Sequence, residues 1–130
     1  MSQIIFVAAG GAAGAVCRYL ITILISRLSG HSPVYTGTVA VNLSGSFAMG
    51  IIFGYLLQNP VIPETVVLTF STGFLGSFTT FSTFALEVQN LLQKPLKDML
   101  TYLILQLAAA LLLAAAGMMA GITAAGGSIG

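Results

Sequence analysis

Charged residues are scarce in this chain of 130 residues: it has four Lys or Arg and three Asp or Glu, together 5% of the sequence. Soluble domains carry about 25% charged residues. Because so few charged side chains cannot cover a water-facing surface, the apolar exterior needs another solvent, and lipid fits. The composition therefore predicts a membrane protein.

Other scarcities exclude whole classes of function. The net charge is +1 and no block of Lys or Arg occurs, so the basic surface that binds nucleic acid is missing. The single cysteine, Cys17, cannot form an internal disulfide, and with one histidine the chain cannot assemble the usual zinc sites. His31, in a Gly-His-Ser-Pro stretch, is interpreted as a solvated loop residue. We therefore expect no enzyme and no nucleic-acid partner.

Apolar residues are abundant: 57% of the residues are hydrophobic and the mean hydropathy is +1.02. A membrane-spanning helix needs roughly 20 predominantly apolar residues, and the chain has four such runs between Gly, Pro and Asn breakers. Short connections make consecutive helices antiparallel neighbours, and Thr38 is the expected cap of the second helix. We predict an all-α membrane protein with one domain over residues 1–130. Its four expected spans are residues 3–26, 37–58, 64–93 and 96–125.

Small residues repeat at four-residue spacing on three of these runs. Such a spacing lets membrane helices approach closely. We expect the repeats to pack helices within the chain, and some to serve a contact between subunits. The repeats are Gly10 with Gly14, Ser46 with Gly50 and Gly54, and Gly117 with Gly121.

Polar residues inside the expected spans are candidates for function, because polar groups are costly in hydrocarbon. Arg18 lies well inside the first span, where it either snorkels to an interface or supplies a positive field in a polar cavity. Asn42 lies one turn past Thr38, and its amide provides two donors. Either a helix–helix hydrogen bond or a role in a pore explains Asn42.

The third run contains Gly73-Phe-Leu-Gly-Ser-Phe-Thr-Thr-Phe-Ser-Thr-Phe84, whose glycines and hydroxyl residues are poor helix formers. A broken helix survives in lipid only where protein or a water-filled path satisfies its backbone, so we expect a break near Gly73–Thr80 that marks a site. The pair of Phe residues that follows is typical of core packing as well as of a site. A single helix face would then carry Phe81 and Phe84, with Ser77 and Thr80 beside them and Glu87 one turn further on.

These residues resemble the Fluc (CrcB-type) fluoride channels over essentially the whole chain. The matching patterns are Gly-Thr-x-x-x-Asn at 37–42, Thr-Thr-Phe-Ser-Thr-Phe at 79–84, Gly-Gly-x-x-Gly-x-x-x-Arg at 10–18, and Glu87. The resemblance implies a channel that exports fluoride passively across the inner (plasma) membrane and gives fluoride resistance. It also implies an antiparallel dual-topology dimer of four-span subunits in lipid, with two pores along the interface.

The resemblance also assigns residues. Phe81 and Phe84 match the paired pore phenylalanines, Asn42 the pore asparagine, and Arg18 the membrane arginine. The backbone carbonyls of the positions that match Gly76 and Thr79 hold, from both subunits, a structural sodium ion at the dimer centre in the family. Hydroxyl groups of the third span extend the expected fluoride path, and the fourth span matches if one residue is deleted near Pro95. These further pore candidates are Ser77, Thr80, Thr83, Tyr102 and Gln106.

Loop charges bear on the partner subunit. Arg27, Lys94 and Lys97 flank the loops on one side of the expected membrane domain, and the other side has no Lys or Arg. Dual-topology subunits usually have little such bias. A homodimer is expected, and a pair of different subunits with opposite fixed orientations stays open.

Two other functions compete on the sequence. A small dual-topology, proton-coupled multidrug exporter needs a carboxylate in its first membrane helix, where this chain has Arg18. A non-transporting assembly subunit would explain the small-residue repeats, but it would leave the Thr-Thr-Phe-Ser-Thr-Phe string without a reason. The sequence favours the fluoride channel.

Overall fold

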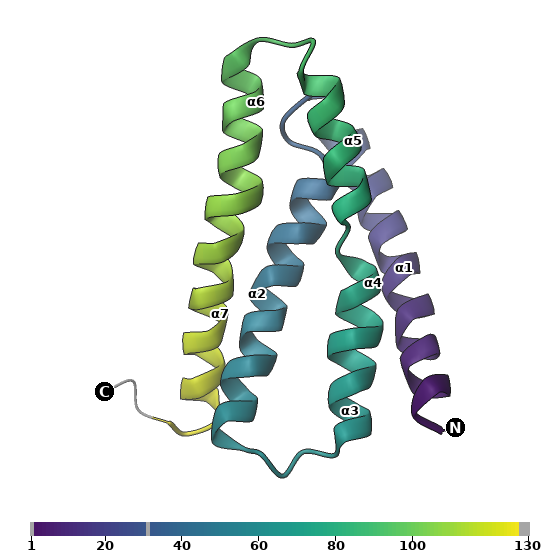
Figure 1. Cartoon of the computed structure of the whole chain (residues 1–130), viewed down its shortest axis with the longest axis vertical. Helices are drawn as coiled ribbons and strands as arrows, with labels where there is room; N and C mark the ends of the chain where they lie inside the picture. The colour runs from purple at the N-terminus through teal and green to yellow at the C-terminus, as the bar shows by residue number, and fades with distance from the viewer. Residues whose placement is uncertain (1, 31, 128–130) are drawn as a thin grey trace.

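The computed structural model describes residues 2–30 and 32–127, so His31 lies outside the described residues. Within these ranges the chain is helical and contains no β-strand, which confirms the all-α prediction. Four passes run along the long axis, and the first begins at the same end of the molecule where the last finishes (Figure 1). The first two passes are α1 (Ser2–Leu28) and α2 (Gly37–Gln58).

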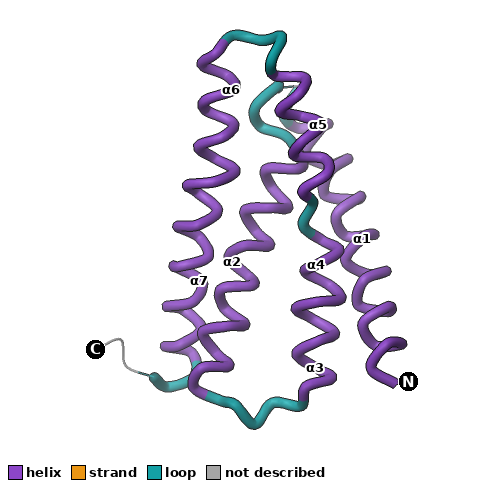
Figure 2. The backbone as a smooth tube through the Cα atoms, in the orientation of Figure 1, coloured by secondary structure: helices purple, strands orange, loops and turns teal. Residues whose placement is uncertain are grey.

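The third and fourth passes are composed of several elements each. The third contains α3 (Glu64–Leu68), the π-helix η1 (Thr69–Leu75), α4 (Gly76–Phe78) and α5 (Phe81–Leu91). Thr79 and Thr80 between α4 and α5 are extended, with ψ values of 157° and 122°, and Figure 2 shows them as a loop within the pass. The break therefore lies at the last two residues of the predicted range, Gly73–Thr80. The fourth pass contains α6 (Leu96–Leu103), the π-helix η2 (Ile104–Ala109) and α7 (Ala110–Ala124).

Three continuous helical stretches are long and apolar enough to cross a membrane: Gln3–Leu28, Gly37–Gln58 and Leu96–Ala124. The third pass is not among them, because its interruption divides it into pieces shorter than the roughly 20 residues that a span requires. The described residues thus form a multi-pass membrane protein.

Glycines bring the helix backbones into direct contact. A Cβ on Gly50 would meet the carbonyl oxygen of Ala114, so α2 and α7 pack backbone to backbone there. A Cβ on Gly10 would meet the carbonyl oxygen of Thr69, and η1 lies equally close to α1. The expected packing role within the chain is confirmed. The other glycines of the predicted repeats approach a neighbouring helix as closely: Gly14 to Phe74, Gly54 to Met118, Gly117 to Phe47 and Gly121 to Ile51.

The N-terminus of α2 differs from the expectation. Thr36 is the cap, and its hydroxyl accepts a hydrogen bond from the Val39 N–H at 3.3 Å. The prediction that Thr38 caps this helix is wrong. Thr36 is the last extended residue, with φ −99° and ψ 164°, and the helix begins at Gly37. Thr38 lies inside the helix, is 2% exposed, and its hydroxyl is available to another partner.

Two small apolar clusters pack on α2. One joins Val39 of α2 to Leu91 of α5 and Tyr102 of α6, and the other joins Val41 to Leu75 and Phe78 of the third pass. Cys17 is half-buried against the second cluster, as a small apolar residue would be. The clusters fix the third and fourth passes around the break.

Candidate functional site

A cleft of about 280 Å³ opens beside the break in the third pass. Side chains from α2, the break, α5 and the fourth pass form its walls, and no charged side chain is among its lining residues in the described part of the chain. The cleft brings together six of the predicted site residues: Asn42, Thr79, Thr80, Phe81, Phe84 and Gln106.

Asn42 holds the break open. Its Oδ1 accepts a hydrogen bond from the Thr80 N–H at 2.8 Å, and its Nδ2 donates to the Thr80 carbonyl oxygen at 3.1 Å. The same Nδ2 donates to Gln106 Oε1 at 3.1 Å, so both of its hydrogens are used. The amide of Asn42 therefore pairs with one peptide group of the third pass and connects it to the fourth.

The hydrogen bonds at the break take the usual helical donors away from the Gly76 and Thr79 carbonyls. In a continuous helix the Thr80 N–H would bond to the Gly76 carbonyl, but here it donates to Asn42. The Thr83 N–H would bond to the Thr79 carbonyl, but it donates to the Thr80 hydroxyl at 3.3 Å. Carbonyl oxygens at the break are thereby available to another ligand.

A second group of hydrogen bonds continues from Gln106 to a carboxylate. Gln106 Nε2 donates to the Tyr102 hydroxyl at 3.1 Å, and that hydroxyl donates to Glu87 Oε2 at 2.6 Å. The hydroxyl of Thr36 donates to the same oxygen at 2.8 Å, and that of Thr38 to Glu87 Oε1 at 2.6 Å. The carboxylate thus accepts three hydroxyl hydrogens, two from the start of α2 and one from α6.

Sequence reasoning missed this carboxylate cluster. A carboxylate well inside an apolar run is a signal in itself, because it requires partners in lipid. Glu87 is separated from Thr36 by 51 positions and from Thr38 by 49, so the sequence alone does not name those partners.

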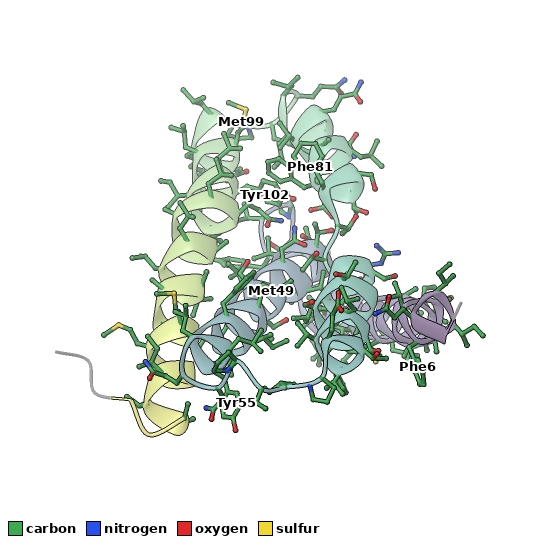
Figure 3. The ribbon with its side chains drawn as sticks, turned by 60° about the horizontal axis from the view of Figure 1, so that its bottom comes forward. Phe6, Met49, Tyr55, Phe81, Met99 and Tyr102 are labelled. Carbon is green, nitrogen blue, oxygen red and sulfur yellow. The ribbon has the colours of Figure 1, made fainter. Side chains whose placement is uncertain are left out.

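The aromatic residues form a row that leads out of this cluster. Tyr102, fully buried, stacks on Phe84 with ring centroids 5.9 Å apart and an interplanar angle of 10°. Phe84 lies 5.5 Å from Phe81 at 44°. Tyr102 points from α6 toward α5, on which Phe81 lies (Figure 3). The ring of Phe81 is 78% exposed, so the row ends at an open edge.

The other predicted site residues lie outside the lining of the cleft. Ser77 faces α1, where a Cβ on Gly11 would lie 4.0 Å from the Ser77 Cβ. The Thr83 hydroxyl pairs with that of Thr80 at 3.1 Å. Arg18 is half-buried on α1. Their roles stay predictions.

Metal ligation by side chains finds no support in the described residues, which contain no group of three or more His, Cys, Asp or Glu that could hold an ion. Backbone oxygens at the break are a different kind of donor set. Gly76 and Thr79, the predicted sodium ligands, are among the residues whose carbonyls lose their helical donors at the break. Hard cations prefer such oxygen ligands.

The sequence is similar to a protein family and to several named proteins. The family described as "CrcB-like protein, Camphor Resistance (CrcB)" matches residues 5–118. A relative from Hahella chejuensis, named "Fluoride-specific ion channel FluC", is 40% identical over 117 residues, which cover 89% of this chain and 91% of the relative.

Two further relatives carry the same name. The protein from Geobacter sp. (strain M21) is 41% identical over 93 residues, covering 72% of this chain and 74% of the relative. The protein from Magnetococcus marinus is 46% identical over 91 residues, covering 70% and 73%. The resemblance noted in the sequence is confirmed, and this chain belongs to the CrcB family.

Proposed function

We propose that this chain is a subunit of a fluoride-specific ion channel and not an enzyme. Its family and the relatives named fluoride-specific ion channels support this function. The observation that carries the proposal is the chemistry of the cleft, where a pair of Phe rings, amides and hydroxyl residues lie together without a charged side chain.

That chemistry suits fluoride. Fluoride is small and strongly hydrated, so a pore must replace several water contacts without a deep cationic trap that would hold the ion. The edge of a Phe ring is the positive end of its quadrupole, so Phe81 and Phe84 offer weak attraction to an anion. The Thr80 hydroxyl and the Gln106 amide along the cleft supply hydrogen bonds. A narrow path of this kind disfavours the larger chloride.

The open edge of the cleft supports a second subunit. Phe81 lines the cleft and is largely exposed, so one chain leaves this wall incomplete. We propose an antiparallel dual-topology dimer of four-span subunits with two pores along the interface. A homodimer is the simplest assembly, and the basic residues near two loops also fit a pair of different subunits. The four passes of Figure 1, although one is interrupted, support four spans.

A sodium ion fits the break. The carbonyls of Gly76 and Thr79 have lost their helical donors, and an unsatisfied carbonyl in hydrocarbon costs several kcal/mol. A two-fold axis through the break would bring two such pairs together. We propose that these carbonyls would hold one structural sodium ion, whose charge would satisfy them and join the subunits.

The expected physiological direction is export across the inner membrane. Fluoride that enters as the neutral acid is trapped as the anion in a less acidic cytoplasm, and the membrane potential then drives the anion out. Passive export of this kind needs no proton carrier and gives fluoride resistance.

Replacement of the ring edges tests the pore. Phe81→Ile and Phe84→Ile each keep apolar bulk and remove the polarised edge, so each variant is expected to remain dimeric and to lose most fluoride efflux from liposomes. Phe6→Ile on α1 is the matched control, because Phe6 is exposed and does not line the cleft. If both cleft variants stay dimeric and conduct like the wild type, the rings only pack.

A further inference from the structure

Thr36 makes two contacts at the start of α2. Its oxygen accepts the hydrogen bond from the Val39 N–H that caps the helix, and its hydroxyl donates to Glu87 Oε2 at 2.8 Å. The two partners belong to different passes, because Val39 is on α2 and Glu87 is on α5. A single hydroxyl therefore connects the beginning of the second pass to the helix that carries Phe81 and Phe84.

The bond from Thr36 completes the hydrogen bonding of Glu87 Oε2. A carboxylate oxygen has two lone pairs, and the Tyr102 hydroxyl occupies the other one at 2.6 Å. The second oxygen, Oε1, accepts from Thr38 at 2.6 Å. Without Thr36 each oxygen would keep one donor, and the carboxylate plane could tilt about the line through its two oxygens. The third donor prevents this tilt and so fixes the acceptor to which Tyr102 is bound.

The position of the Tyr102 hydroxyl matters for the ring beside it. Tyr102 is fully buried, and its ring lies 5.9 Å from that of Phe84 with an interplanar angle of 10°. Because the two rings are stacked, a tilt of the Tyr102 ring also tilts Phe84. A Phe ring attracts an anion with its edge and repels it with its face. The plane of Phe84 therefore decides what this ring offers to the cleft that it lines.

We propose that Thr36 is a positioning residue, which acts through Glu87 and Tyr102 to keep the edge of the Phe84 ring toward an ion in the cleft. Thr36 is not among the lining residues of the cleft in the described part of the chain, so its effect on the ion is indirect. Loss of its hydroxyl weakens fluoride binding, because the ring is then free to turn its face to the ion. This inference rests on the proposed function and names a residue outside the cleft that sets its geometry.

Substitutions of Thr36 separate the hydroxyl from the shape of the side chain. Thr36→Val keeps the branched shape without the hydroxyl, and Thr36→Ser keeps the hydroxyl. In fluoride efflux from liposomes, Thr36→Val is expected to raise the half-saturating fluoride concentration about threefold and to lower the fluoride-to-chloride ratio, with a smaller change in maximal rate. Thr36→Ser is expected to retain the wild-type values. The control Thr123→Val removes an exposed hydroxyl that bonds only to carbonyls of α7, and it is expected to match the wild type.

Thr36→Gly separates the cap from the contact to Glu87. Glycine is about as favourable as threonine at an N-cap, but it has no hydroxyl to donate. Since the bond to Glu87 carries the proposed effect, Thr36→Gly is expected to behave like Thr36→Val. A Thr36→Gly variant with wild-type half-saturation and selectivity would overturn the proposal, because the effect of valine would then come from the cap.

The orientation of the ring is measured without any ion flux. In protein in nanodiscs with ¹³C-labelled Phe rings, Thr36→Val is expected to shift or broaden the signals of Phe84. The signals of Phe6, which is exposed on α1, are expected to stay unchanged. The Phe84→Ile spectrum identifies the Phe84 signals. Identical Phe84 signals in the wild type and in Thr36→Val would overturn the proposal.

These results keep the two claims distinct. If the wild type conducts fluoride and Thr36→Val changes neither the flux nor the Phe84 signals, the positioning role is wrong and the channel function stands. If the wild type conducts no fluoride and the Phe84 signals still respond to Thr36→Val, Thr36 orients the ring and the channel function is wrong.

Discussion

Asn42→Ala is the substitution that most directly tests how the break is held. The change removes three hydrogen bonds: one from the Thr80 N–H, one to the Thr80 carbonyl and one to Gln106. Thr80 is 9% exposed, so water does not simply replace the lost partner. The substitution should therefore destabilise the folded subunit and release the peptide group of Thr80.

The magnitude follows from these three bonds. Each hydrogen bond contributes about 1 kcal/mol net in typical mutational series, and about 0.6 kcal/mol between membrane helices. Their sum predicts a loss of roughly 2–3 kcal/mol in the free energy of unfolding. Asn90→Ala is the matched control, because Asn90 lies exposed on α5 and an exposed substitution of this kind changes stability by about 0.5 kcal/mol or less.

Reversible unfolding of the full chain in mixed micelles, by titration with a denaturing detergent, measures both variants. Hydrogen exchange at the Thr80 amide adds a local readout, since that N–H loses its acceptor and should exchange faster. A change in unfolding free energy equal to that of Asn90→Ala, with unchanged exchange at Thr80, would refute the idea that Asn42 holds the break.

Two further predictions concern packing and the ion. Gly10→Ala should destabilise the fold by about 1–3 kcal/mol, because its Cβ would meet the Thr69 carbonyl. Gly11→Ala should be neutral or stabilising in the same detergent titration, since the nearest neighbour of its Cβ would lie 3.8 Å away, and equal effects of the two substitutions would contradict this packing. Thr79→Ser keeps the backbone carbonyl and should leave sodium-dependent dimerisation intact, whereas replacing sodium by a bulky organic cation should weaken the dimer or its activity. A dimer equally stable and active in both cations would exclude the sodium site.

The sequence predicted the break in the third pass because glycine and hydroxyl residues weaken a helix locally, and that signal needs no knowledge of the fold. It did not predict how the break is satisfied, because Asn42 and Thr80 are 38 positions apart and meet only when α2 packs beside the third pass. The two π-helices, η1 and η2, were not predicted from the sequence.

The same limit applies to the carboxylate cluster and the cap. Glu87 was visible as a charge inside an apolar run, but its partners depend on where α2 begins. Thr36 and Thr38 are both good capping residues, and only the backbone conformation decides between them. Local composition therefore indicated the elements and the position of the break, whereas the contacts between elements required the structure.

Passive efflux from liposomes that contain the purified wild-type protein tests the central claim most directly. Fluoride and chloride release would be measured with ion-selective electrodes, with a potassium ionophore to balance charge and no imposed proton gradient. A fluoride channel releases fluoride down its gradient and releases chloride far more slowly. Equal chloride release, or fluoride release only when a proton gradient is imposed, would contradict the account.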